Sequence, residues 1–141
     1  MKITARPGWY KNFVNFSKLY FMSSVKEIAD RLVALCREGQ YETAQKELYA
    51  KDAVNLEPEG APMPGVKGLD AIIEKGHQFG AGVEEIHSNF VSDPLIAGDH
   101  FSVSAIMDLT MKGMGRVKME EVCVYEVKDG KIVKEQFFYS M

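Results

Sequence analysis

The amino-acid sequence predicts an α+β fold in which three helices from the N-terminal half pack on a curved, mainly antiparallel sheet. Two observations predict it. Residues 99–139 have the pattern of three long strands joined by two tight turns, with apolar and polar residues alternating along them. Upstream, three segments carry apolar residues at helical spacing. Helices followed by a run of antiparallel strands are typical of α+β domains.

Two helices are expected first. Residues 25–38 begin after a capping box formed by Ser24 and Glu27, and Gly39 provides the stop. A second helix over residues 41–49 follows almost at once. Because so few residues join them, the two helices must turn sharply against each other.

The middle of the chain alternates between short elements and loops. We expect a strand over residues 52–58, a loop over 59–68 that is rich in proline and glycine, a helix over 69–79 and a strand over 86–92. Gly76 falls on the inner stripe of the third helix, where glycine costs about 1 kcal/mol relative to alanine. Its presence predicts either close packing or space left for another group.

The C-terminal strands are joined by residues that favour tight turns. Gly113 and Gly115 tolerate positive φ, and the Asp129-Gly130 pair favours a type I′ hairpin. Between the turns, one face of the strand is expected to carry Val117, Met119, Glu121, Cys123 and Tyr125. Neither face is wholly polar, so we expect a core on one side and a partner subunit on the other.

Composition narrows the class of protein. The 141 residues, 46% of them hydrophobic, suffice for one domain with its own core. A net charge of −3, without a basic cluster in the domain, gives no reason to expect nucleic acid or anionic lipid as a partner. No apolar run is long enough for a membrane span. Cys36 and Cys123 lie in apolar segments, which favours free thiols in a reducing compartment and a cytoplasmic protein. No metal-ligand spacing, phosphate loop or other cofactor motif is present.

Residues 1–21 differ from the remainder, which we assign to one domain over residues 22–141. The segment is basic, lacks acidic residues and places aromatic side chains at helical spacing. It lacks the features of a secretory signal. We interpret it as an extension that packs on the domain or has no role; binding to a membrane surface is the alternative.

Several motifs together resemble the SnoaL-like group of the nuclear transport factor 2-like superfamily over residues 24–139. They are LYAKDAV at residues 48–54, GLDAI at 68–72 and VKDGKIV at 127–133, ahead of the aromatic residues 137–139. The resemblance implies a cone-shaped fold whose concave sheet face and helices enclose a pocket, and dimerisation through the outer sheet face. The superfamily includes isomerases, polyketide cyclases, epoxide hydrolases, dehydratases and noncatalytic binding proteins.

The resemblance also implies where a site lies. In ketosteroid isomerases the general base precedes a proline at the end of the first strand, where this chain has Glu57 before Pro58. We therefore expect three catalytic carboxylates, Glu57, Glu121 and Glu135, and a substrate pocket lined by Asn55, His77, His87, Cys123, Phe137 and Tyr139. The two groups that stabilise the oxyanion in those isomerases would fall near Leu32 and Cys123, so ketosteroid isomerisation itself is disfavoured.

These residues lead to two hypotheses. Carboxylates that converge in an apolar pocket raise one another's pKa and become usable acids or bases, which suits an isomerase, cyclase, dehydratase or hydrolase acting on a small, mostly apolar molecule. The alternative is a noncatalytic ligand-binding or dimerisation module, in which Lys or Arg would neutralise the carboxylates. Apolar residues on the outer face predict a homodimer in either case; they are Ile106, Val122, Val124 and Phe138.

Overall fold

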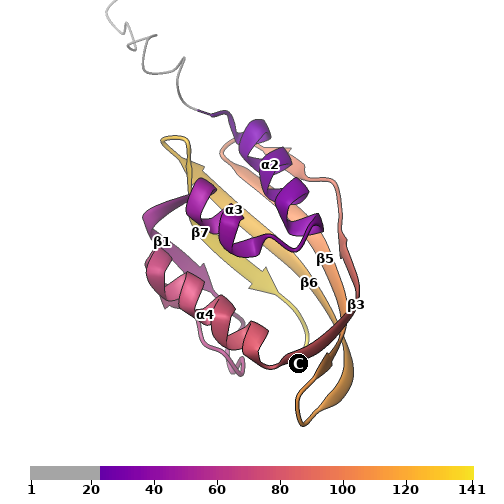
Figure 1. Ribbon diagram of the computed structural model, residues 1–141. Helices are drawn as coiled ribbons and strands as arrows, with labels where there is room; N and C mark the ends of the chain where they lie inside the picture. The colour runs from indigo at the N-terminus through magenta and orange to yellow at the C-terminus, as the bar shows by residue number, and fades with distance from the viewer. Residues whose placement is uncertain (1–22) are drawn as a thin grey trace, which may run out of the picture.

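The structure, a computed structural model, describes residues 23–141, which form three helices and a seven-stranded sheet (Figure 1). The helices are α2 (Val25–Arg37), α3 (Tyr41–Leu48) and α4 (Leu69–Ala81). The strands are β1 (Tyr49–Leu56), β2 (Val66–Lys67), β3 (Val83–Val91), β4 (Leu95–Ala97), β5 (His100–Met111), β6 (Gly115–Lys128) and β7 (Lys131–Phe138). The predictions about residues 1–21 fall outside the described residues.

Of the two hydrogen bonds of the expected capping box, the one to the Ser24 side chain is present at the start of α2. The Ser24 side chain accepts a hydrogen bond from the backbone N–H of Glu27, 3.1 Å away. Gly39 has a φ of +72° just beyond the end of the helix, which lets the chain reverse into α3. Both helices therefore form within one residue of their predicted bounds.

The sheet has the order β2-β1-β7-β6-β5-β3, and β4 also pairs with β5. Every pairing is antiparallel except that of β1 with β7, which is parallel. The predicted mainly antiparallel sheet is thus confirmed. Strands β1 and β3 begin three residues earlier than expected, and β2 and β4 are too short to be recognised from alternation.

The turn between β6 and β7 has the predicted geometry. Asp129 and Gly130 have φ values of +50° and +74°, as a type I′ turn requires at both central positions. The turn pairs Lys128 with Lys131, and a register shift between Glu126 and Val127 then places Tyr125 opposite Glu135 and Cys123 opposite Phe137.

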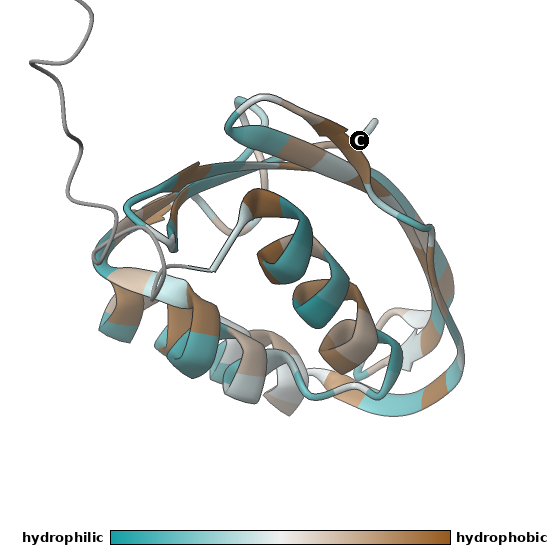
Figure 2. Cartoon of the chain, turned by 90° about the horizontal axis from the view of Figure 1, so that it is seen from above, coloured by the Kyte–Doolittle hydropathy of each residue, from teal (hydrophilic) through white to brown (hydrophobic). Residues whose placement is uncertain are grey.

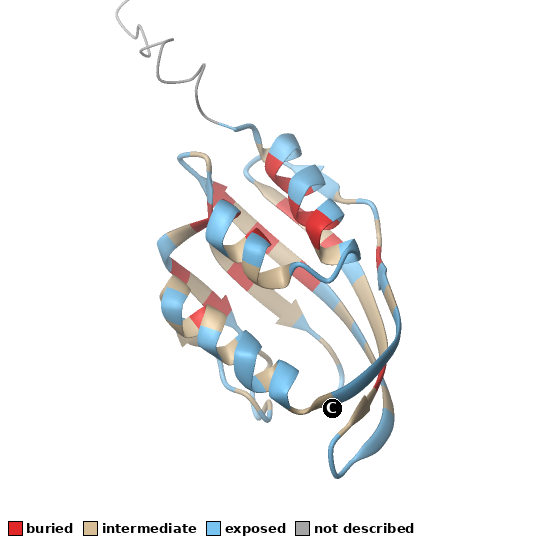
Figure 3. Cartoon of the chain, viewed as in Figure 1, coloured by how far each residue is buried: buried red, intermediate tan, exposed pale blue. Residues whose placement is uncertain are grey.

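All three helices lie on one side of the curved sheet (Figure 2), and the buried residues gather between the two layers (Figure 3). Phe101 and Tyr125 stack within this core, with ring centroids 4.7 Å apart. On the outer face, Phe90, Val122 and Phe138 keep about half of their surface exposed, at 53%, 46% and 49%. The helices therefore cover one face of the sheet and leave apolar side chains on the other.

Within residues 23–141, no helix has the length and apolar character needed to cross a membrane. The same part of the chain brings together no group of three His, Cys, Asp or Glu side chains able to hold a metal ion.

Two glycines differ in a way that the sequence does not reveal. Gly76 is exposed, and a Cβ added there would meet no atom within 4 Å, so neither close packing nor a neighbouring ligand group explains it. A Cβ added at Gly65 would instead lie 2.5 Å from the carbonyl oxygen of Asn55. Gly65 is therefore the glycine that a close backbone approach requires.

We expect Gly76→Ala and Gly65→Ala to change stability in opposite directions. The first removes the helix-interior penalty of glycine and should raise the free energy of unfolding by about 1 kcal/mol. The second forces β1 away from the 59–65 loop and should lower it by about 1–3 kcal/mol. Urea denaturation of both variants measures the difference, and equal effects of the two substitutions would contradict the contact at Gly65.

Candidate functional site

The core of the site is a buried polar pair on neighbouring strands. Asn55 of β1 and Glu135 of β7 are register partners in the parallel pairing, and their side chains are directed to the helix side of the sheet. They are 2% and 4% exposed. Asn55 Nδ2 donates to Glu135 Oε1 over 3.0 Å, and the Tyr49 hydroxyl donates to Glu135 Oε2. The buried carboxyl therefore has two hydrogen-bond donors.

Helix α4 adds a cation to this pair. Lys75 Nζ donates to Asn55 Oδ1 over 2.6 Å and to Glu57 Oε1 over 2.5 Å. The Tyr139 hydroxyl donates to the second oxygen of Glu57 over 2.8 Å. The result is a continuous chain of hydrogen bonds, which we call the Lys75 network; its members are Tyr49, Glu135, Asn55, Lys75, Glu57 and Tyr139.

Burial controls the protonation of Glu135. The loss of hydration raises the pKa of its carboxyl to about 7, and the negative charge of Glu57 adds to the rise. The hydrogen bonds from Tyr49 and Asn55 and the positive charge of Lys75 act in the opposite direction. Glu135 is thus poised to gain or lose a proton near neutral pH.

Glu57 is held as an ion pair. Its side chain is 7% exposed and that of Lys75 is 15% exposed, so both charges are largely removed from water. The neighbouring Tyr139 has its pKa raised to about 12, first by burial and then by its hydrogen bond to Glu57. Tyr139 is therefore a hydrogen-bond donor at neutral pH.

Glu121 lies on the inner face of β6, half buried, in a different electrostatic position. Burial raises the pKa of its carboxyl and the charge of Glu57 raises it further, whereas a hydrogen bond from Cys123 Sγ, 3.5 Å away, and the charge of Lys75 lower it. None of the ion pairs formed within residues 23–141 includes Glu121. It is a carboxylate without a paired cation in that part of the chain.

Tyr41 of α3 lies close to the same carboxyl. Burial raises the pKa of its hydroxyl to about 12, and the charges of Cys36 and Glu121 contribute to the rise. Asn89 of β3 lowers the pKa of this tyrosine and donates from Nδ2 to the Cys36 carbonyl over 2.8 Å. The charge of Glu121 therefore acts on Tyr41, and the charges of Glu57 and Lys75 act on Glu121.

The structure brings together most of the residues that the sequence singled out. Glu57, Glu135, Asn55 and Tyr139 belong to the Lys75 network, and Glu121 and Cys123 lie next to it. Phe137 is half buried and packs against the hydrophobic core opposite Cys123.

The two expected pocket histidines lie elsewhere. His77 is exposed on α4, and its Nε2 lies 2.7 Å from a Glu42 oxygen, so the pKa of its imidazole is raised. His87 Nε2 lies 2.8 Å from Thr110 Oγ1 on the neighbouring strand. Neither makes a hydrogen bond within the Lys75 network.

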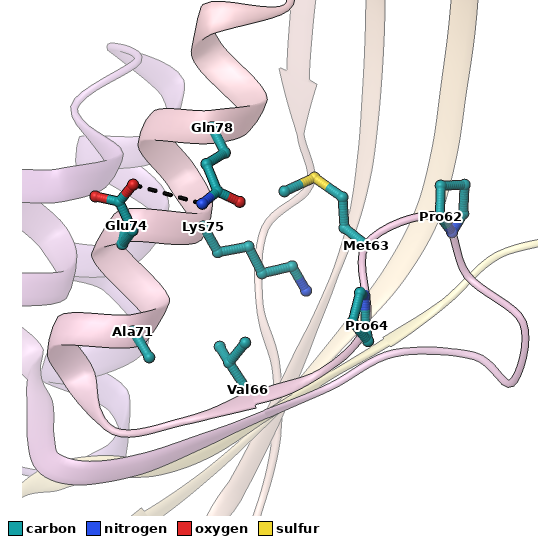
Figure 4. Close-up of a pocket in the computed structure, with 8 residues that line it drawn as sticks. All are labelled: Pro62, Met63, Pro64, Val66, Ala71, Glu74, Lys75 and Gln78. Atoms are coloured by element: carbon teal, nitrogen blue, oxygen red, sulfur yellow. Dashed lines mark hydrogen bonds between the residues drawn. The ribbon is translucent and has the colours of Figure 1, made fainter.

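A partly open pocket of about 340 Å³ lies between α4 and the loop before β2 (Figure 4). It is lined by Pro62, Met63, Pro64, Val66, Ala71, Glu74, Lys75 and Gln78. None of the residues predicted from the sequence lines it. Lys75 does, and it connects the pocket to the buried carboxylates. The pocket therefore opens beside α4, whereas the resemblance implied one enclosed by the concave sheet.

Three side chains of the candidate site were not predicted from the sequence. Lys75 follows Ile72 by three residues and precedes Phe79 by four, so it falls on the stripe that faces inward, and this spacing is the signal that points to it. Tyr41 and Tyr49 could be assigned to packing alone, because aromatic residues beside apolar ones are usually core. The hydroxyl partner of Tyr49, Glu135, comes from a strand distant in the sequence.

Comparisons with known proteins agree with the observed fold. A family model described as a SnoaL-like domain matches residues 23–139. The chain is similar to the crystal structure of a candidate SnoaL-like polyketide cyclase, also labelled a carbohydrate phosphatase, from Mesorhizobium loti, with 33% identity and a TM-score of 0.78 over 83% of this chain and 100% of the other.

Two further solved structures share the fold at lower identity. A protein of ketosteroid isomerase-like fold from Catenulispora acidiphila, solved with trimethylamine, is 20% identical with a TM-score of 0.65, over 82% of this chain and 86% of the other. IdmH, a candidate polyketide cyclase from Streptomyces antibioticus, is 20% identical with a TM-score of 0.63, over 82% and 91%. No curated protein matches the chain.

The raised pKa of Glu135 predicts a specific pH dependence of stability. The folded protein holds this proton up to about pH 7, whereas the unfolded chain releases it near the ordinary value of 4.5, so the stability contribution is full below that value and is lost as pH rises to 7. Relative to Glu135→Gln, the wild type should lose about 3 kcal/mol of unfolding free energy across this window. Urea titrations at a series of pH values measure it, and parallel pH profiles for the two proteins would contradict the assignment.

Proposed function

We propose that this chain, which belongs to the SnoaL-like domain family, binds a small, mostly apolar molecule and acts on it by carboxylate acid/base chemistry. The reaction classes that suit such a site are those of an isomerase, cyclase, dehydratase or hydrolase. Proton abstraction next to a carbonyl group is a step that an isomerase, a cyclase and a dehydratase can share, whereas a hydrolase would use the carboxylate to activate water.

The observation that carries the proposal is the state of Glu121. Its carboxyl is half buried, has a raised pKa, and forms no ion pair with any side chain of residues 23–141. It also feels the charges of both Glu57 and Lys75. A general base needs a pKa closer to neutrality than an exposed glutamate has, and it must be free to accept a proton.

In the proposed step, a Glu121 carboxylate oxygen removes a proton from the carbon next to the substrate carbonyl. The C–H bond breaks, an O–H bond forms on Glu121, and the released electron pair produces an enolate. Where a C=C bond is conjugated with the enolate, return of the proton to the far carbon of that bond gives an isomer. Attack of the enolate carbon on a second carbonyl of the same molecule closes a ring, and the alkoxide that forms takes the proton back from Glu121. Both outcomes are balanced without an added oxidant or reductant.

Glu135 serves this site from within the core. It is 4% exposed and lies behind Asn55, so it is a positioning residue and does not contact the substrate. Through Asn55 it holds the oxygen that accepts a hydrogen bond from Lys75. Its contribution is to keep the ammonium group in one place.

One observation favours a second function, that of a noncatalytic ligand-binding module. Glu57, the residue at the general-base position implied by the resemblance, is neutralised by Lys75, as expected for a module without catalysis. Glu121 and Glu135 lack such a cation among the described residues, and this difference favours the catalytic proposal. We also propose a cytoplasmic location, in keeping with the free thiols of Cys36 and Cys123.

We expect Glu121→Gln to abolish proton exchange while leaving binding intact. Removal of a general base lowers the rate about 10²- to 10⁴-fold. The assay is deuterium incorporation from D₂O next to the carbonyl of small apolar ketones, with α-tetralone as the first of the panel, followed by NMR.

Glu120→Gln is the matched control, because Glu120 neighbours Glu121 on β6 but is exposed and pairs with Lys118. This variant should keep the wild-type exchange rate. Ketones that bind the wild type without any exchange would support the noncatalytic module and overturn the proposed chemistry.

A homodimer through the outer sheet face is the second expectation of this proposal. Val122 and Phe138 are register partners on adjacent strands, and both are about half exposed, as is Phe90 two strands away. We expect a dimer mass in light scattering at micromolar concentration and a monomer mass for Val122→Glu/Phe138→Glu, because the introduced charges would have to be buried. Thr43→Glu on the helical side is the control, and a monomeric wild type would refute the dimer.

A further inference from the structure

Lys75 has one hydrogen-bond donor that the network does not use. An ammonium group carries three N–H donors. Two are engaged, by Asn55 Oδ1 at 2.6 Å and by Glu57 Oε1 at 2.5 Å, and among residues 23–141 no third acceptor is within hydrogen-bond distance. The same side chain lines the 340 Å³ pocket and remains 15% exposed.

Lys75 differs in its positive charge from every other residue that lines the pocket. Five of the eight lining residues are apolar: Pro62, Met63, Pro64, Val66 and Ala71. The other two polar residues, Glu74 and Gln78, are exposed neighbours on α4 with a long contact of 3.5 Å between them (Figure 4). Lys75 is therefore the single cationic group in the lining, at the point where the pocket meets the buried carboxylates.

We propose that Lys75 is the oxyanion-binding residue of this protein, and that its third N–H holds the carbonyl oxygen of an apolar ketone or ester. The inference deepens the proposed function and depends on it for the reaction. Because Glu121 does not line this pocket, the ligand would have to extend from Lys75 toward β6, where Glu121 feels the charge of Lys75. When the neighbouring carbon loses its proton, the carbonyl oxygen gains negative charge, and a charge-assisted hydrogen bond from the ammonium becomes stronger at that moment.

The ion pair with Glu57 fits this role. A lysine fixed by two acceptors has lost its rotational freedom before the ligand arrives, so the donor is preorganised. Glu57 also lowers the net charge at the site, which leaves a neutral carbonyl acceptable in the ground state.

The experiment uses 4-nitrophenol, an apolar ring with one oxygen that is either neutral or anionic, and whose anion is yellow. Lys75→Met alone would leave Glu57 buried and unpaired, so the comparison is made in the Glu57→Gln background. We expect Glu57→Gln to bind the phenolate more tightly than wild type, because the ammonium is no longer shared with a carboxylate.

Addition of Lys75→Met to Glu57→Gln should weaken phenolate binding about 10- to 100-fold, the value of one hydrogen bond to a charged group. The affinity of 4-nitrotoluene, which has the same shape and no oxygen to bind, should not change. Lys46→Met, which also separates a Lys–Glu pair but on exposed α3, is the matched control and should leave both affinities unchanged.

Three outcomes would overturn the inference: no binding of 4-nitrophenol to the wild type, equal phenolate affinity with and without Lys75, or equal losses for 4-nitrophenol and 4-nitrotoluene. They are distinguishable from failure of the proposed function. Phenolate binding that depends on Lys75, in a protein that exchanges no ketone protons, would confirm the oxygen site and exclude the reaction. Exchange of ketone protons that persists in Glu57→Gln/Lys75→Met would support the reaction and exclude the oxygen site at Lys75.

Discussion

The parallel pairing of β1 with β7 is the constraint on which the site depends. It places Asn55 directly beside Glu135 under the helices, where a carboxyl group must find hydrogen-bond partners or lose stability. Tyr49 and Asn55 supply them, and Asn55 then has an oxygen that only α4 can reach. The position of Lys75 follows from that requirement. One pairing between the first and last strands thus determines the arrangement of three elements.

The site stabilises two of its carboxyl groups in different ways. Glu57 is stabilised as an anion by a partly buried ammonium group, whereas Glu135 is stabilised largely as the acid by burial. Glu121 lies between these cases, half buried and within the field of both charges. Glu57 is therefore paired with a cation, whereas burial raises the pKa of both Glu121 and Glu135, and such differences in environment are what acid/base chemistry requires of neighbouring carboxyl groups.

Much of the fold could be predicted because local patterns determine it. The period of two in β6 correctly placed Glu121, Cys123 and Tyr125 on one face, and Asp129-Gly130 correctly indicated the hairpin turn. The register shift between Glu126 and Val127, which decides what lies opposite Tyr125, was not predicted. The site was recovered only in part. Tyr49 and Lys75 act through Glu135, Asn55 and Glu57, which lie 18 to 86 positions away, and no local pattern reports such contacts. His77 and His87 were expected in the pocket because imidazole groups often take part in catalysis. In the structure their rings instead contact Glu42 and Thr110, which no local pattern indicates.

The two walls of the pocket differ in how they are anchored to the rest of the fold. Lys75 projects from a helix and is anchored to two long strands, whereas the opposite wall is a proline-rich loop joined to the sheet by the two-residue β2 and the close approach of Gly65 to β1. Loops of this kind accept insertions and substitutions that strands do not. Substitutions within residues 59–64 would therefore reshape this wall of the pocket and leave the hydrogen bonds of the Lys75 network in place.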